Sequence, residues 1–129
     1  MILPESSIWI DYFNGKMTPK TELLEEVLAM GEALVGDLIL THVLQGFRDE
    51  GDFQRAKHLL TCLPFREILG QEIAWQSAQN YRLLRQRGIK IHNTMNVVIA
   101  TFCIVNRIRL LQNNHDFMPM VEHLGLTVL

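Results

Sequence analysis

The sequence predicts an α/β fold in which a parallel sheet carries helices on both of its faces. Short extended segments alternate with helical segments along the chain, and this alternation is typical of parallel sheets. The 129 residues include 48% hydrophobic and 20% charged residues, enough to bury a core in one domain. No repeat, low-complexity tract or linker interrupts the chain, so we expect residues 1–129 to form a single domain.

Each expected element follows from hydrophobic periodicity and from residues that start or stop it. The expected strands are residues 2–4, 64–69, 89–91 and 109–112, and Gly125 leads into residues 126–129. The expected helices are residues 6–12, 19–30, 37–47, 52–62, 71–87, 94–106 and 116–124. The clearest start is Thr18-Pro19, because threonine caps a helix and proline at the first position needs no hydrogen bond. Gly31, Gly88 and Gly125 fit the ends. Gly51-Asp52, Asn93 or Thr94, and Asp116 are expected to start the later helices.

Charge and cysteine content narrow the class of protein. The net charge of -2 gives no general attraction to nucleic acid, so an RNA ligand would need a local basic patch. Cys62 and Cys103 show no CxxC spacing, and we expect both to be reduced core residues, which suits the cytoplasm. The longest nearly apolar run, 97–105, is too short to cross a bilayer, so we expect a cytoplasmic protein without a membrane partner.

Four distant stretches place a polar residue within an apolar framework. They are ILPESSIWI (2–10), LTHVLQGFR (40–48), TMNVVIAT (94–101) and LLQNNHDF (110–117). Glu5 and Asn114 each follow an expected strand, which places them at the edge of a parallel sheet where ligands gather. Together the stretches resemble the four acid-bearing segments of PIN-domain ribonucleases, and most closely those of VapC, the toxin of bacterial toxin–antitoxin pairs.

The resemblance implies a PIN-like three-layer sandwich and a metal-dependent endoribonuclease. It also implies a cognate VapB-like antitoxin as partner and a homodimer. In that family the four positions carry acids that hold Mg²⁺ or Mn²⁺, which polarises the phosphate and activates water. The matching catalytic positions are Glu5, His42, Asn96 and Asn114, and Asp116 matches a further aspartate that the family often carries.

Among those four positions only Glu5 keeps a carboxylate. Asn96 and Asn114 are neutral, and the imidazole of His42 suits Zn²⁺ or Ni²⁺ better than Mg²⁺. We therefore expect Glu5, Asn96, Asn114 and Asp116 to bind a metal weakly or not at all, and cleavage to be impaired or lost. The alternative is a catalytically silent module that engages antitoxin or RNA without cleaving. The changes at the acid positions arose either by natural selection or by deliberate substitution.

These residues also have purely structural interpretations. Asp116 could cap a helix, Asn114 could lie in a turn, and Asn96 could cap the first turn of its helix. His42 could be a hydrogen-bonded histidine among apolar neighbours. Taken singly, each structural interpretation is the commoner one; the coincidence of all four positions favours the site.

The densest positive charge lies in AQNYRLLRQRGIKI (78–91), where Arg82 and Arg85 could contact RNA phosphates. Alternatively, Arg85 only stabilises the end of its helix. Arg48 could contact RNA or pair with the acidic residues that follow it. Ser7 could bind a phosphate or a metal-bound water, or cap a helix.

An apolar set could receive an antitoxin helix in a groove. It comprises Trp9, Phe13, Ile39 and Leu44. The alternative is that these side chains form the core or a dimer interface.

Overall fold

The computed structural model describes residues 1–129, which divide into two compact units. Unit 1 comprises Met1–Glu67 and Leu111–Asn113, and unit 2 comprises Ile68–Leu110 and Asn114–Leu129. None of the helices combines the length and the hydrophobicity that a membrane span requires. A single domain over the whole chain stays a prediction.

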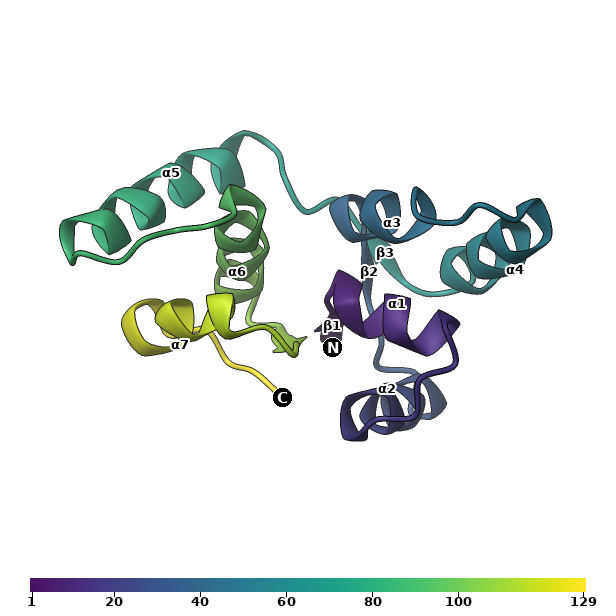
Figure 1. Ribbon diagram of the computed structural model, residues 1–129. Coiled ribbons are helices and arrows are strands. Elements are labelled where there is room, and N and C mark those ends of the chain that lie inside the picture. The colour runs from purple at the N-terminus through teal and green to yellow at the C-terminus, as the bar shows by residue number, and fades with distance from the viewer. The chain divides into compact units, whose positions relative to one another are not determined.

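Unit 1 combines short parallel strand pairings with helices (Figure 1). Its elements are β1 (Ile2–Pro4), α1 (Ser6–Phe13), α2 (Pro19–Ala29), β2 (Val35–Gly36), α3 (Asp37–Leu44), α4 (Glu50–Thr61) and β3 (Phe65–Arg66). Strands β2 and β3 are parallel, with Val35 opposite Phe65. Ile2 forms a parallel bridge with Ala33, and the backbone N–H of Glu5 donates to the carbonyl of Leu111 at 2.9 Å. Helix α1 packs on α2 and α3, and α3 packs on α4.

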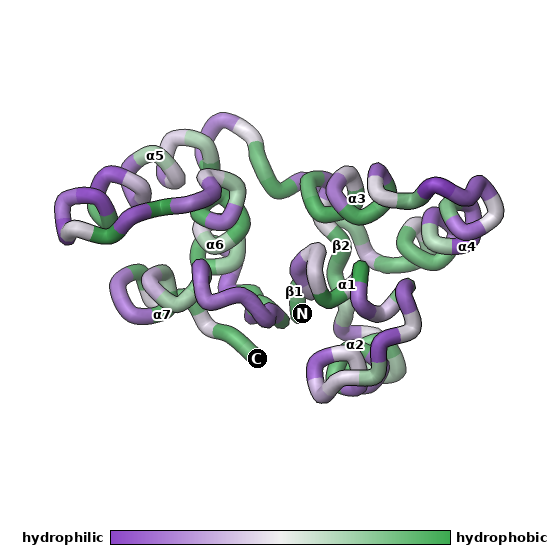
Figure 2. The backbone as a smooth tube through the Cα atoms, in the orientation of Figure 1, coloured by the Kyte–Doolittle hydropathy of each residue, from purple (hydrophilic) through white to green (hydrophobic).

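The core of unit 1 explains why these elements stay together. Leu3, Ile8, Trp9 and Leu24 are fully buried, and Ile39 is almost so. Trp9 and Ile39 are therefore core residues, as the alternative interpretation had it, and they cannot line an open groove. Trp9 also stacks on Phe13, with 5.9 Å between the ring centroids. In Figure 2 the tube beside the β2 label is green, the colour of hydrophobic residues.

The sequence signals at α2 are confirmed in atomic detail. The Thr18 hydroxyl accepts a hydrogen bond from the Thr21 N–H at 3.1 Å, and the Thr21 hydroxyl accepts one from the Thr18 N–H at 2.8 Å. This reciprocal capping satisfies two backbone donors that the first turn leaves open. The helix stops before Gly31, whose φ of 69° is a conformation that glycine adopts without strain.

Unit 2 is built on two packed helices, with a shorter helix against both (Figure 1). Its elements are α5 (Gln71–Gln86), α6 (Thr94–Asn106), β4 (Arg109–Leu111, whose last residue belongs to unit 1), the 3₁₀ turn η1 (His115–Phe117) and α7 (Met118–Leu124). Leu110 forms a parallel bridge with Val128. The Asn80 amide donates to the Thr101 hydroxyl at 3.0 Å, a polar tie between α5 and α6.

Several sequence-based boundaries were wrong. Helix α4 begins at Glu50, because Asp49 caps it by accepting the Asp52 N–H at 2.9 Å. Only two residues of 64–69 form a strand, and 89–91 form none. Cys62 is exposed, because it lies at the end of α4 outside the buried face formed by Ala56 and Leu60. Cys103 is buried as expected.

Parallel pairing is thus present, as the α/β prediction requires. The three-layer arrangement with helices on both faces of one central sheet stays a prediction.

Candidate functional site

Glu5 joins the end of β1 to the start of α1 and is the N-cap of that helix. Its Oε1 accepts a hydrogen bond from the Ser7 N–H at 3.0 Å and a second from the Ser7 hydroxyl. The side chain is only 7% exposed. Ser7 is therefore a hydrogen-bond donor to Glu5, and Glu5 rather than Ser7 caps the helix.

Burial is the largest effect on the pKa of the Glu5 carboxyl. Loss of water around the carboxyl raises its pKa above the ordinary value of 4.5. The hydrogen bonds from Ser7 and the electrostatic effect of His42 lower the pKa of Glu5, but they do not cancel the effect of burial. His42 lies on α3 and is exposed, so it is not a histidine enclosed by apolar neighbours. Unit 1 thus brings together Glu5 and His42, two of the positions that the sequence singled out.

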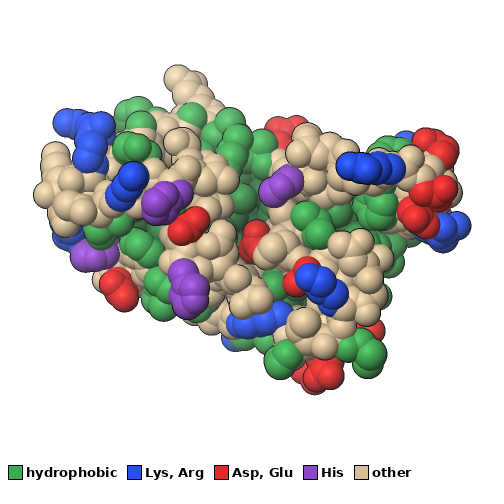
Figure 3. Space-filling model, in the orientation of Figure 1, with side chains coloured by type: hydrophobic (Ala, Val, Ile, Leu, Met, Phe, Trp, Pro, Cys, Tyr) green, Lys and Arg blue, Asp and Glu red, His purple; other side chains and the backbone are tan.

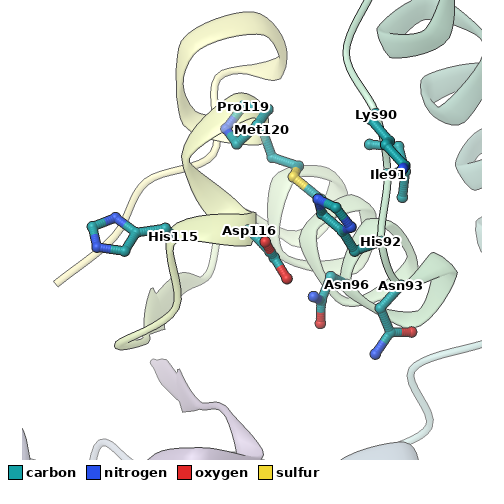
Figure 4. A pocket seen from close by; sticks show the side chains of 9 residues that line it. All are labelled: Lys90, Ile91, His92, Asn93, Asn96, His115, Asp116, Pro119 and Met120. Atoms are coloured by element: carbon teal, nitrogen blue, oxygen red, sulfur yellow. The ribbon is translucent and has the colours of Figure 1, made fainter.

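Unit 2 brings together two further positions. Asn96 and Asp116 line one pocket of about 130 Å³, together with Lys90, His92 and His115. The side chains of Asn96 and Asp116 point into the same hollow, whereas His115 points away from it (Figure 4). Lys90 and His92 were not among the residues predicted for this site. Their place within the three residues before the Asn93 cap of α6 is the signal that would have found them.

Capping roles in unit 2 differ from those expected. Asn93 caps α6 by accepting the Met95 N–H at 3.0 Å, so Asn96 is not the cap. Asn114, not Asp116, caps η1, because its side chain accepts the Asp116 N–H at 2.9 Å. The reason is position: an N-cap precedes the first helical residue, and Asp116 already lies within η1. Asp116 thereby keeps its carboxylate on the pocket side (Figure 4).

The donor set can be compared with what a hard divalent ion requires. Mg²⁺ prefers anionic oxygen ligands and gives up its water reluctantly. Unit 1 offers the Glu5 carboxylate, whose Oε1 is already engaged twice by Ser7, and unit 2 offers Asp116. Neither unit gathers three histidine, cysteine, aspartate or glutamate side chains that could hold a metal. Each unit alone therefore does not fit Mg²⁺ or Mn²⁺.

The basic candidates lie on exposed surfaces. On the face shown in Figure 3, lysine and arginine side chains gather over the C-terminal end of α5. Arg85 lies over the ring of Tyr81, with its guanidinium carbon 5.8 Å from the ring centroid. Arg82 instead lines an apolar pocket of about 410 Å³.

Arg48 is exposed and forms no ion pair with the acidic residues that follow it, so that alternative is wrong. It lines a cavity of about 630 Å³ in unit 1 together with Tyr12, Phe13 and Phe47. The rings of Phe13 and Phe47 meet edge to face, with 5.7 Å between their centroids. This cavity therefore has aromatic side chains in its wall and an arginine that forms no ion pair.

No family model matches the chain, and no curated protein matches its sequence. Solved structures do match over nearly the whole length. A chain of the VapBC2 complex from Rickettsia felis, crystallised with a DNA fragment from its promoter, has a TM-score of 0.77 and 17% identity. The match covers 100% of this chain and 98% of that one.

Two more structures agree. A chain of FitAcB from Neisseria gonorrhoeae matches 99% of this chain and 96% of its own length, with a TM-score of 0.79 and 11% identity. A toxin–antitoxin complex from Klebsiella pneumoniae matches with a TM-score of 0.67 and 20% identity, covering 91% of this chain and 90% of the other. The chain has a VapC-like PIN fold. The resemblance that the four sequence stretches indicated is therefore confirmed for the fold. The positions described above lie on a PIN fold.

Proposed function

We propose that this chain is the VapC-like component of a toxin–antitoxin pair whose endoribonuclease site is impaired or lost. The observation that carries the proposal is the state of Glu5. It is the one carboxylate among the four matched positions, it is buried, and its Oε1 is already engaged by Ser7. A carboxylate in this state is a poor ligand for a hard cation.

The missing anions at the matched positions lower the expected affinity for a divalent metal. At an effective dielectric constant of 20, a pair of unit charges separated by 4 Å interacts by about 4 kcal/mol. His42, Asn96 and Asn114 each remove one anion relative to the pattern that the sequence resembles. Even after allowing for solvent, the loss weakens Mg²⁺ or Mn²⁺ binding by several kcal/mol on the same scale. Cleavage that depends on a metal-activated water would fall with it.

The proposed partner is a VapB-like antitoxin. The structural neighbours include toxin–antitoxin complexes, and this supports a protein partner of that kind. We further propose a homodimer, a cytoplasmic location, and RNA contact through Ser7, Arg48, Arg82 and Arg85. The exposed, unpaired Arg48 supports such a contact.

Restoring the acids tests the proposal. The restored variant carries Glu5→Asp, His42→Glu, Asn96→Asp and Asn114→Asp, and it is incubated with structured RNA and Mg²⁺ or Mn²⁺ beside the unaltered chain. We expect cleavage by the restored variant only. A restored variant that also carries Asp116→Asn is the matched control, because it keeps the four acids and removes the neighbouring one. Circular dichroism confirms that each variant is folded.

Two results would reject parts of the proposal. Equal cleavage by the unaltered and restored chains would show that the substituted site is active. Tight Mg²⁺ uptake by the unaltered chain in calorimetry, abolished by Glu5→Ala, would reject the electrostatic argument directly.

A second candidate function is a catalytically silent binding module. The aromatic cavity beside Arg48 favours it, because ring walls and one free cation suit a segment of a protein partner. If neither chain cleaves RNA but Phe47→Ala and Arg48→Gln weaken antitoxin binding, this module is the better description.

A further inference from the structure

The pocket of about 410 Å³ in unit 2 contains none of the matched acid positions. It lies on α5 and α6 and shares no lining residue with the pocket of Asn96 and Asp116. Its volume falls within the range of small-molecule sites, roughly 300 to 1,000 Å³. It therefore has room for a ligand of its own.

The walls of this pocket are apolar and well supported. Leu69, Ala74 and Ala78 contribute from α5 and the residues before it, and Val98 contributes from α6. Close to this wall, α5 and α6 are tied by the Asn80–Thr101 hydrogen bond. Thr101 in turn donates to a carbonyl of α6 at 2.7 Å. The apolar surface thus lies on two helices that are hydrogen-bonded to each other.

Ser77 is the unusual residue of the lining. It is only 5% exposed, and its Oγ is covered yet has no hydrogen-bond partner. A buried hydroxyl without a partner is destabilising, so such groups are uncommon and often mark a ligand or a bound polar atom.

Arg82 is the only charged residue in the lining. It is exposed and forms no ion pair, and no carboxylate of the chain lines the pocket with it. Arg85, one turn away, lies over the Tyr81 ring and does not line the pocket. The lining therefore offers one cation and one orphan donor beside an apolar wall.

We propose that this pocket binds an amphipathic monocarboxylate. The aliphatic or aromatic body lies against the apolar wall, the carboxylate pairs with the Arg82 guanidinium, and one carboxylate oxygen accepts a hydrogen bond from the Ser77 hydroxyl. Charge complementarity selects an anion over a neutral or cationic ligand of the same shape. The inference is independent of the proposed toxin function, because it uses none of the matched acid positions.

The test is a titration of ¹⁵N-labelled protein with sodium octanoate, followed by NMR. Octanol is the neutral comparison, because it keeps the chain and lacks the carboxylate. We expect saturable shifts at amides of α5 and the start of α6, and binding of octanol weaker by about tenfold, the loss of one charge-assisted hydrogen bond.

Three variants test the contributions of Arg82, Arg85 and Ser77 to octanoate binding separately. Arg82→Gln should weaken octanoate binding by about tenfold. Arg85→Gln is the matched control and should change it by less than about twofold, because an exposed charge outside the pocket is screened. Ser77→Ala should weaken octanoate binding yet raise the melting temperature of the free protein, because it removes the unpaired hydroxyl. A residue with only a packing role would not shift the two readouts in opposite directions.

Several outcomes would overturn the proposal. These are the absence of saturable shifts, equal binding of octanol, or equal losses for Arg82→Gln and Arg85→Gln. Sedimentation is measured in parallel. If octanoate shifts appear only where a second copy of the chain is displaced from α5, the face is a self-association surface and the proposal is wrong.

Discussion

Replacing Glu5 by glutamine separates two effects of this side chain. Glutamine keeps an oxygen that can accept the Ser7 N–H, bonded at 3.0 Å in the unaltered chain, but it cannot ionise. Burial raises the pKa of Glu5 above 4.5, so the folded chain holds the carboxyl proton more tightly than the unfolded chain. Below pH 4.5 both states are protonated and the cost of burying a charge is absent. As pH rises through the raised folded pKa, that part of the stability is lost.

Glu5→Gln should therefore be more stable than the unaltered chain at about pH 7 and equal to it below pH 4.5. Glu5→Ala loses the helix cap, about 1 kcal/mol, and the hydrogen bond from the Ser7 hydroxyl, about 1 kcal/mol more. It should be roughly 2 kcal/mol less stable than Glu5→Gln, which lowers the melting temperature by about 7 °C for a chain of this length.

Urea and thermal unfolding followed by circular dichroism measure both differences. His42→Gln is the control for the electrostatic effect of His42, which acts on Glu5 less strongly than burial does. The difference between Glu5 and glutamine should persist in that background. A Glu5→Gln variant less stable than the unaltered chain at about pH 7 would refute the reasoning, since the carboxylate would then be stabilised in its charged form.

Three further predictions follow from burial and backbone geometry. Phe117→Ala should cost about 3–5 kcal/mol in chemical unfolding, because the ring is fully buried; a cost below about 1 kcal/mol would contradict its place in the core. A thiol reagent should modify exposed Cys62 quickly in the native chain and Cys103 only after unfolding, since burial raises the pKa of Cys103 to about 12. Arg107→Gly should stabilise the chain by about 1 kcal/mol, because Arg107 has a φ of 56°; a lower unfolding midpoint would show that its side chain contributes more than the strain.

The sequence predicted best where local chemistry alone decides the structure. Thr18 and Pro19 start α2, and Gly88 and Gly125 follow helix ends at φ values of 77° and 81°. These are properties of a few neighbouring residues, so no tertiary information is needed. The start of α4 failed for a related reason: Asp49 and Asp52 are both acceptable caps, and sequence does not say which one the first N–H groups will meet.

Strand length and burial required the tertiary structure. The stretch 64–69 looks extended, yet only Phe65 and Arg66 pair with a neighbour. Cys62 looks like a core residue because it follows an apolar pattern, but the helix ends one residue earlier. Strand pairing joins segments that are distant in the sequence. A local pattern therefore predicts that a segment is extended better than it predicts how many of its residues pair.

For the candidate site, the sequence pattern predicted the location of the site residues better than it predicted their structural roles. It singled out Asn96 and Asp116, which share a pocket, and Glu5 and His42, which interact. It exchanged the roles of Asn114 and Asp116, because the exact start of η1 depends on the loop that precedes it. The rise in the pKa of Glu5 could not be predicted from the sequence, since it depends on burial.

The backbone contact between Glu5 and Leu111 has a consequence for biosynthesis. When the ribosome has released Met1–Glu67, the residue that accepts from this amide is still roughly forty codons away, a delay of a few seconds. During that interval the end of β1 at Glu5 lacks this partner, and the extended backbone there is open to pairing with other polypeptides. Premature termination before codon 111 should therefore leave a fragment that aggregates or needs a chaperone.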